Sequence, residues 1–180
     1  MNDSPDPLYI FAYGSLVWRP GFEYVDVQPG VVHDYERRFW QASHDHRGTP
    51  EKPGRVVTLV KIPGGRCEGL LYRIQEENRQ HILATLDERE QDGYERTWLS
   101  AVVGNGQATV SVLTWLAGKD NPSWCGDTAL DELAQLIQTR HGPSGSNREY
   151  LLRLHAGLLD LGVTDDHVSA LVSRLKAADN

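Results

Sequence analysis

Strand-type and helix-type hydrophobic patterns occupy separate parts of the 180-residue chain. Residues 8–13, 38–43 and 56–62 are short runs rich in aromatic and β-branched side chains, which favour strands. The last third instead carries leucines at helical spacing. Strands followed by helices predict an α+β fold with a strongly bent antiparallel sheet or a small barrel, and a helical C-terminal third.

Turn-forming residues predict two β-hairpins and one inserted helix. Pro63-Gly64-Gly65 lies between apolar runs, so residues 55–74 are expected to form the first hairpin. Residues 96–103 and 107–116 flank Gly104-Asn105-Gly106 and predict the second. Between them, residues 75–91 have apolar side chains at helical spacing, and Gly93 is placed to cap that helix.

Three helices are expected near the C-terminus. Thr128 precedes the first, which Gly142-Pro143 closes. Ser146 and Glu149 match a capping box that opens the second, and Gly162 stops it. Thr164 is expected to cap the last.

Length and charge narrow the function classes. Residues 1–180 predict a single domain, with residues 1–7 as a flexible acidic leader that does not resemble a secretory signal. The net charge of −7 argues against nucleic-acid and membrane partners, and all of it lies after residue 75, because residues 1–75 carry nine basic and nine acidic side chains. No run is apolar enough to span a membrane, and the two cysteines fit a reducing compartment, so we expect a cytoplasmic protein.

The sequence lacks a Walker A loop and the GxGxxG, HExxH and GxSxG motifs, which leaves few chemical candidates. The segment Tyr13-Gly14-Ser15-Leu16 leaves an apolar strand through a glycine. Such a bend can free backbone N–H groups to bind an anion or a developing oxyanion. The alternative is an ordinary turn at the end of a strand.

Glu90 is the candidate general acid/base. It is expected near the C-terminus of the inserted helix, where the dipole is negative, with Asp87, Glu88 and Asp92 close in sequence. These charges would raise the pKa of the carboxyl group, which suits proton transfer near neutral pH. The alternative is a solvated acidic helix end in which Arg89 offsets the repulsion.

The segment His44-Asp45-His46 is the candidate metal site. On a strand, alternation would put both imidazoles on one face, with His33 as a distant third nitrogen ligand. This pattern would fit a metal-dependent hydrolase built on His44, Asp45 and His46. Hydrogen-bonded loop histidines are the alternative.

An ordered series of short motifs resembles the ChaC-like γ-glutamylcyclotransferases. The motifs begin with Tyr13-Gly14-Ser15-Leu16 and cover about residues 9 to 175; the others are Arg37-Arg38-Phe39-Trp40-Gln41, Asp45-His46-Arg47-Gly48, residues 53–60, Leu86-Asp87 with Arg89-Glu90, Gly93-Tyr94, Asp120-Asn121-Pro122, and Gly142-Pro143-Ser144-Gly145 with Asn147, Glu149, Tyr150 and Leu151.

The resemblance implies a small mixed or antiparallel β-barrel with flanking helices. It also implies a glutathione-specific enzyme that releases 5-oxoproline and cysteinylglycine without metal or organic cofactor. Carried over to this sequence, Tyr13, Gly14, Ser15 and Leu16 would bind the γ-glutamyl group and Glu90 would be catalytic. A non-catalytic protein that binds γ-glutamyl compounds is the remaining alternative, and the oligomeric state stays open.

The chain departs from the family pattern at two positions. Asp92-Gly93 stands where the family usually has two glycines, which adds a carboxylate two residues from Glu90. Trp115 stands where related enzymes often have a tyrosine.

Overall fold

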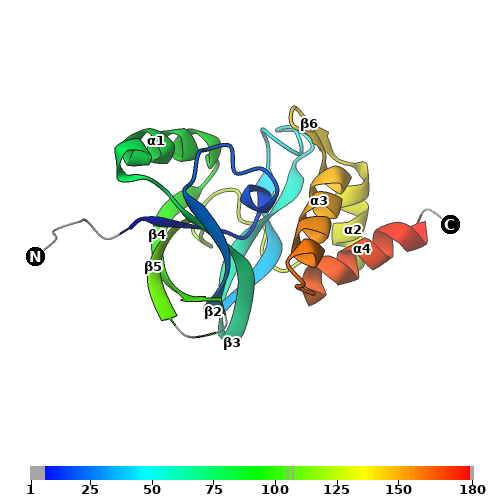
Figure 1. Cartoon of the computed structure of the whole chain (residues 1–180). Helices are drawn as coiled ribbons and strands as arrows, with labels where there is room; N and C mark the ends of the chain where they lie inside the picture. Colours follow the sequence, from blue (N-terminus) through cyan, green and yellow to red (C-terminus); the bar gives the residue numbers. More distant parts are fainter. Residues whose placement is uncertain (1–6, 105, 107, 179–180) are drawn as a thin grey trace, which may run out of the picture.

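Five strands close a barrel in the computed structural model, which describes residues 7–104, 106 and 108–178 (Figure 1). Residues 1–6 of the expected leader therefore lie outside the described residues. The order around the barrel is β1-β3-β2-β4-β5; the strands are β1 (Tyr9–Ala12), β2 (Asp26–Ser43), β3 (Gly54–Arg73), β4 (Tyr94–Val103) and β5 (Ala108–Ala117). Because β1 pairs antiparallel with β3 and parallel with β5, the barrel is mixed, and the α+β barrel fold is confirmed.

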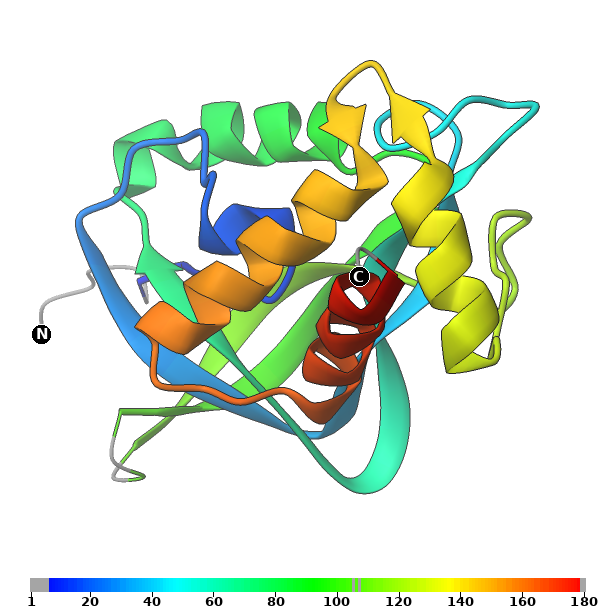
Figure 2. The same cartoon turned by 90° about the vertical axis from the view of Figure 1, so that its right-hand side faces the viewer.

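Helices cover two sides of the barrel. In Figure 1, α1 (Arg79–Arg89) lies on one side, after the 3-10 turn η2 (Glu76–Asn78). The C-terminal helices α2 (Leu130–Thr139), α3 (Asn147–Asp160) and α4 (Asp166–Ala178) lie on the other and pack against one another (Figure 2). A two-stranded ribbon of β6 (His141–Gly142) and β7 (Gly145–Ser146) joins α2 to α3. No helix among the described residues has the length and apolar character to cross a membrane.

The predicted hairpin over residues 55–74 is wrong. Residues 54–73 are one continuous strand, β3, which pairs along its whole length with β2. Pro63-Gly64-Gly65 lies at a register shift instead of a turn. There the left-handed Asp34 on β2, with φ of 61°, accepts a hydrogen bond from the Gly64 N–H at 2.8 Å, so the local turn signal produces a bulge that bends the barrel wall.

The other strand and helix predictions hold with shifted boundaries. Strands β4 and β5 form the second hairpin, although residues 105 and 107 of its turn lie outside the described residues. The inserted helix ends at Arg89, so Gly93 does not cap it. Ser146 caps α3 by accepting a hydrogen bond from the Glu149 N–H at 3.0 Å. The cap of α4 is Asp165, which accepts from the Val168 N–H at 3.0 Å, and not Thr164.

Apolar packing holds the helices to the barrel. The larger cluster joins inward-facing strand residues such as Phe11 and Phe39 to Leu133, Leu154 and Leu171 from the three C-terminal helices, and all five are buried. A second cluster lies under α1 and includes Leu86. Burial of each leucine contributes about 1.5–3 kcal/mol relative to an exposed position.

A buried arginine crosses this core. The Arg37 side chain is 0% exposed and makes three contacts: its Nε donates to the Tyr13 carbonyl at 2.6 Å, its Nη2 donates to the Glu68 carbonyl at 2.5 Å, and its Nη1 lies 2.5 Å from Asp165 Oδ2. Strand β2 is thereby connected to β3, to the N-terminus of α4 and to the segment that follows β1. Loss of the carboxylate would leave a buried positive charge without its partner.

The Asp165→Ala variant should therefore lower the free energy of unfolding by about 3 kcal/mol or more, because it removes the partner of Arg37 and the cap of α4 together. Urea denaturation measures this loss. As a control, Asp131→Ala removes an exposed ion pair with Arg174 and should change stability by less than about 1 kcal/mol. Equal losses in the two variants would contradict the role assigned to the buried pair.

Candidate active site

One cavity of about 370 Å³ collects all five site residues that the sequence predicts. Its lining includes Tyr13, Gly14, Ser15, Leu16 and Glu90. The first four follow β1 directly and lead into the 3-10 turn η1 (Ser15–Val17), whereas Glu90 directly follows α1. These segments are far apart in the chain, so the fold alone brings them together.

The segment after β1 presents backbone to this cavity. Gly14 is the N-cap of η1, and the Val17 N–H donates to the Gly14 carbonyl at 3.0 Å to form a single 3-10 turn. The N–H groups of Ser15 and Leu16 lie in the first turn of η1, where the helix supplies no acceptor for them. A Cβ at Gly14 would lie 3.0 Å from Val57 Cγ2 and 3.3 Å from the Tyr150 hydroxyl, so glycine allows the close approach of this backbone.

Glu90 is the C-cap residue of α1. Its N–H donates to the Leu86 carbonyl at 2.7 Å, and its side chain is 19% exposed. Arg89 is its nearest ion-pair partner, with 3.5 Å between Arg89 Nε and Glu90 Oε1. The carboxyl group therefore lies within the cavity wall and not on a solvated helix end.

Three tyrosines surround this carboxyl group. The Tyr13 and Tyr94 hydroxyls donate to the backbone carbonyls of Trp115 and Val57, at 2.7 and 2.6 Å. Burial is the largest cause that raises the pKa of all three tyrosines. The charge of Glu90 is the second cause for Tyr13, and for Tyr94 it follows the effects of Tyr13 and Tyr150. The three phenols therefore stay protonated near neutral pH, and the hydroxyls of Tyr13 and Tyr94 donate to backbone carbonyls.

The pKa of Glu90 is raised, in the direction that the sequence predicts, but mostly from another cause. Burial has the largest effect, followed by Arg89 and His46, which lower the pKa, and Asp45, which raises it. The acidic neighbours Asp87, Glu88 and Asp92 are not among the groups responsible. Burial in the folded chain, more than the charge pattern in the sequence, therefore raises the pKa of this carboxyl group.

Arg89 links the two halves of the site. Its Nη2 donates to the Ser15 hydroxyl at 2.9 Å and its Nη1 to the Pro20 carbonyl at 2.9 Å, while its Nε faces Glu90. The side chain thus holds the end of α1 against the segment after β1. Two further arginines, Arg19 and Arg47, also line the cavity.

The metal-site interpretation is wrong. Strand β2 ends at Ser43, so His44, Asp45 and His46 do not alternate on a strand. His44 pairs with Asp92, whereas His46 lies against Ser144 and Asp45. Within residues 7–104, 106 and 108–178, no group of three His, Cys, Asp or Glu side chains is arranged to hold a metal ion.

The residue patterns did not single out Tyr94 and Tyr150 as part of the site, although both line the cavity. Tyr94 and Tyr150 lie within the ordered motifs, which was the available signal, but Tyr150 also reads as part of the apolar face of a helix. Trp115 does line the cavity, and its indole N–H is taken by Asp87 at 2.9 Å. The indole N–H of Trp115 is therefore already bonded within the protein.

Comparisons with known proteins agree with this geometry. A family model described as ChaC-like protein matches residues 8–178. The chain is 38% identical over 177 residues to glutathione-specific gamma-glutamylcyclotransferase 1 of Homo sapiens, covering 95% of this chain and 80% of the human protein. It is 36% identical to gamma-glutamylcyclotransferase 2-3 of Arabidopsis thaliana, over 94% of this chain and 88% of the plant protein. A solved yeast gamma-glutamyl cyclotransferase specific to glutathione superimposes with a TM-score of 0.89 at 28% identity, over 95% of this chain and 96% of the yeast chain.

The raised pKa of Glu90 gives a pH-dependent stability prediction. A carboxyl group whose pKa is raised on folding holds its proton more tightly in the folded state, so its ionisation destabilises the fold as pH rises, and the cost disappears below its ordinary pKa of about 4.3. Glu90→Gln should therefore raise Tm at pH 8, and this gain should shrink as pH falls through the raised pKa and disappear below the ordinary pKa of about 4.3. Thermal melts across that range measure it. The exposed neighbour gives the control, Glu88→Gln, which should show no such trend; a gain for Glu90→Gln that grows on acidification would contradict the assignment.

Proposed function

The chain belongs to the ChaC-like protein family, and from this membership we propose that it is a glutathione-specific γ-glutamylcyclotransferase. The observation that carries the proposal is the meeting of a buried, pKa-raised Glu90 with the Tyr13-Gly14-Ser15-Leu16 backbone in one cavity. The names of the human relative and of the yeast structure give the same substrate.

The reaction needs no nucleophile from the protein. The α-amine of the γ-glutamyl group attacks its own γ-carbonyl carbon, and the bond from that carbon to the cysteine nitrogen breaks. Because the ring closes within one molecule, holding the substrate folded removes much of the entropic barrier. The products are 5-oxoproline and cysteinylglycine, and water is not consumed.

Glu90 moves the proton in this scheme. The substrate amine has an ordinary pKa of about 7.7–8.0, so it must lose a proton before it can attack. A carboxylate at the usual glutamate pKa would be a weak base, and the raised pKa of Glu90 brings it closer to the amine. The protonated Glu90 then delivers the same proton to the departing cysteine nitrogen.

The opposite wall of the cavity would hold the charges of the substrate. The N–H groups of Ser15 and Leu16, in the first turn of η1, would donate to the oxyanion that forms at the γ-carbonyl. Glutathione carries two carboxylates and one ammonium group, and Arg19, Arg47 and Arg89 at the cavity offer complementary charge. A cytoplasmic location and independence from metal and organic cofactors remain predictions from the sequence.

Purified protein incubated with glutathione should release equal amounts of 5-oxoproline and cysteinylglycine, and chromatography detects both. A parallel incubation with γ-glutamylalanine measures how far the activity is restricted to glutathione. Calorimetric binding of glutathione without any product at high enzyme concentration would favour a non-catalytic binding protein and contradict the proposal.

The Glu90→Gln variant should lower kcat by about 10²–10⁴-fold, because it keeps the shape of the side chain but cannot carry the proton. Glutathione affinity, measured by calorimetry, should stay within a few-fold of the wild type. Glu88→Gln at the exposed neighbouring position is the matched control and should turn over normally. Wild-type turnover in Glu90→Gln would assign the base to another group.

A further inference from the structure

The turn that follows Glu90 adopts an unusual backbone conformation. Asp92 has φ of 64° and Gly93 has φ of 91°, so two successive residues lie in the left-handed region. Glycine adopts this region freely, whereas a residue with a side chain adopts it at a cost of about 1 kcal/mol or more. At Gly93 a Cβ would lie 2.6 Å from the Asn121 side chain, so glycine is required there. Asp92 has a side chain and still adopts the left-handed conformation, and the contacts of that side chain offset the conformational cost.

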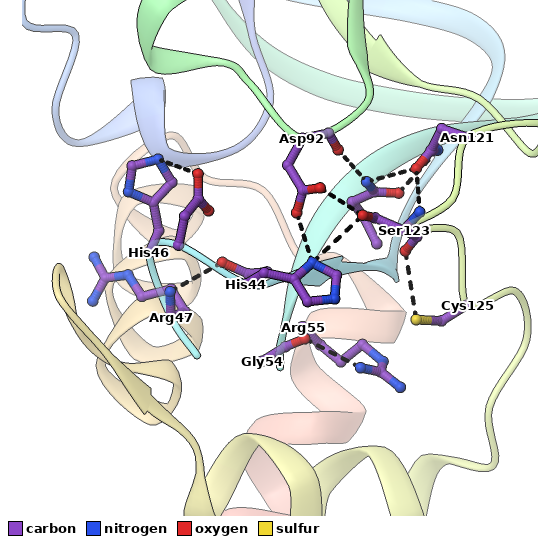
Figure 3. A network of polar contacts seen from close by, with 12 residues as sticks. His44, His46, Arg47, Gly54, Arg55, Asp92, Asn121, Ser123 and Cys125 are labelled. Atoms are coloured by element: carbon purple, nitrogen blue, oxygen red, sulfur yellow. Dashed lines mark hydrogen bonds and ion pairs between the residues drawn. The ribbon is translucent and has the colours of Figure 1, made fainter. Parts of the chain in front are cut away.

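The carboxylate and the backbone carbonyl of Asp92 both contact residues outside the turn (Figure 3). Its Oδ2 lies 2.9 Å from His44 Nδ1, and its Oδ1 accepts a hydrogen bond from the Ser123 hydroxyl at 2.6 Å. Its backbone carbonyl accepts from Gln41 Nε2 at 2.6 Å, and Gln41 is 0% exposed. Burial alone would raise the pKa of Asp92, but the hydrogen bonds from Ser123 and His44 outweigh it and lower that pKa, so the carboxylate is ionised near neutral pH.

The groups that hold Asp92 are themselves fixed. Gln41 Nε2 donates to Asn121 Oδ1 at 3.0 Å, and Asn121 Nδ2 donates back to Gln41 Oε1 at 3.2 Å. The Ala42 N–H donates to the Ser123 carbonyl at 2.8 Å, which joins the segment around Ser123 to the end of β2. The turn after Glu90 is thus anchored to the barrel and not to solvent.

Ser123, His44 and Asp92 do not form a nucleophilic triad. In such a triad the serine bonds one imidazole nitrogen and the carboxylate bonds the other. Here both Ser123 Oγ, at 3.5 Å, and Asp92 approach the same atom, Nδ1, and the Ser123 hydroxyl donates directly to Asp92. His44 and Ser123 are also not among the residues that line the cavity, whereas Asp92 is. The cluster is therefore an anchor.

We propose that Asp92 is a positioning residue for catalysis: its anchorage to His44, Ser123 and Gln41 fixes the turn that holds Glu90 in the cavity. Glu90 lies two residues before it, after the last turn of α1, and its side chain lies 3.5 Å from Arg89 Nε. Displacement of a catalytic group by about 1 Å can cost about 10²-fold in rate. This inference rests on the proposed function, because it assigns Asp92 a role through Glu90.

The Asp92→Gly variant tests this role, because it removes the side-chain anchor and also the cost of the left-handed conformation. Its kcat on glutathione should fall about 10- to 100-fold, with KM within about threefold of the wild type and Tm nearly unchanged. Asp92→Asn keeps the size, accepts from Ser123 and tolerates a left-handed conformation, so it should recover most of the lost kcat. A purely structural role would instead lower Tm and change kcat and KM together.

Asp34→Gly is the matched control. Asp34 also adopts the left-handed backbone conformation, with φ of 61°, and its carboxylate accepts a hydrogen bond from the Gly64 N–H. It lies in the bulge of the barrel wall and not among the residues that line the cavity. Its substitution should leave kcat unchanged. A kcat of Asp92→Gly within twofold of the wild type, or equal losses in the two variants, would overturn the inference.

Hydrogen exchange of the same variants separates this inference from the proposed function. Amides of residues 90–94 should exchange faster in Asp92→Gly than in the wild type, with the rest of the chain unchanged and Asp34→Gly normal in this segment. If wild-type protein converts no glutathione while the exchange result holds, the proposed function fails but the anchor stands. Unchanged exchange in residues 90–94 would overturn the anchor whatever the turnover.

Discussion

Arg37 is the interaction on which the arrangement of this molecule depends. Its guanidinium group is buried inside the packing between the barrel and the C-terminal helices, where a charge is costly unless every donor is matched. The three acceptors come from Asp165 at the start of α4, from Glu68 on β3 and from the Tyr13 carbonyl. Because Tyr13 opens the segment after β1 that lines the cavity, the same side chain that joins α4 to the barrel also fixes one wall of the cavity.

The other wall of the cavity carries Glu90, whose carboxyl group is largely buried although it lies at the end of a surface helix. Glu90 follows α1, where an acidic side chain would ordinarily be solvated, yet its side chain is only 19% exposed at the cavity wall. Burial then outweighs the attraction of Arg89 and raises the pKa of the carboxyl group. The charge partition of the sequence gains a meaning under the proposed function, since the neutral first part would supply the backbone that holds the anion and the acidic remainder supplies Glu90.

Local pattern predicted the parts of the fold that local forces determine. The β4–β5 hairpin and the Ser146 cap follow from neighbouring residues, and both are present. The length of β3 could not be read in this way, because Pro63-Gly64-Gly65 signals a turn locally, and only pairing with Asp34 on the distant strand β2 makes it a bulge. The same limit applies to the site. Glu90 was identifiable, but the contacts of Tyr94, Tyr150 and Asp92 depend on segments that meet only in the folded chain.

The central claim is that the protein cleaves its substrate by internal cyclisation within this cavity and not by hydrolysis. Turnover of glutathione in water labelled with oxygen-18, followed by mass spectrometry of the products, tests it directly. Attack by the amine keeps the original γ-carbonyl oxygen, so the account predicts 5-oxoproline that carries no label. Release of glutamate with a labelled γ-carboxyl group would show that water is the nucleophile and would contradict the account.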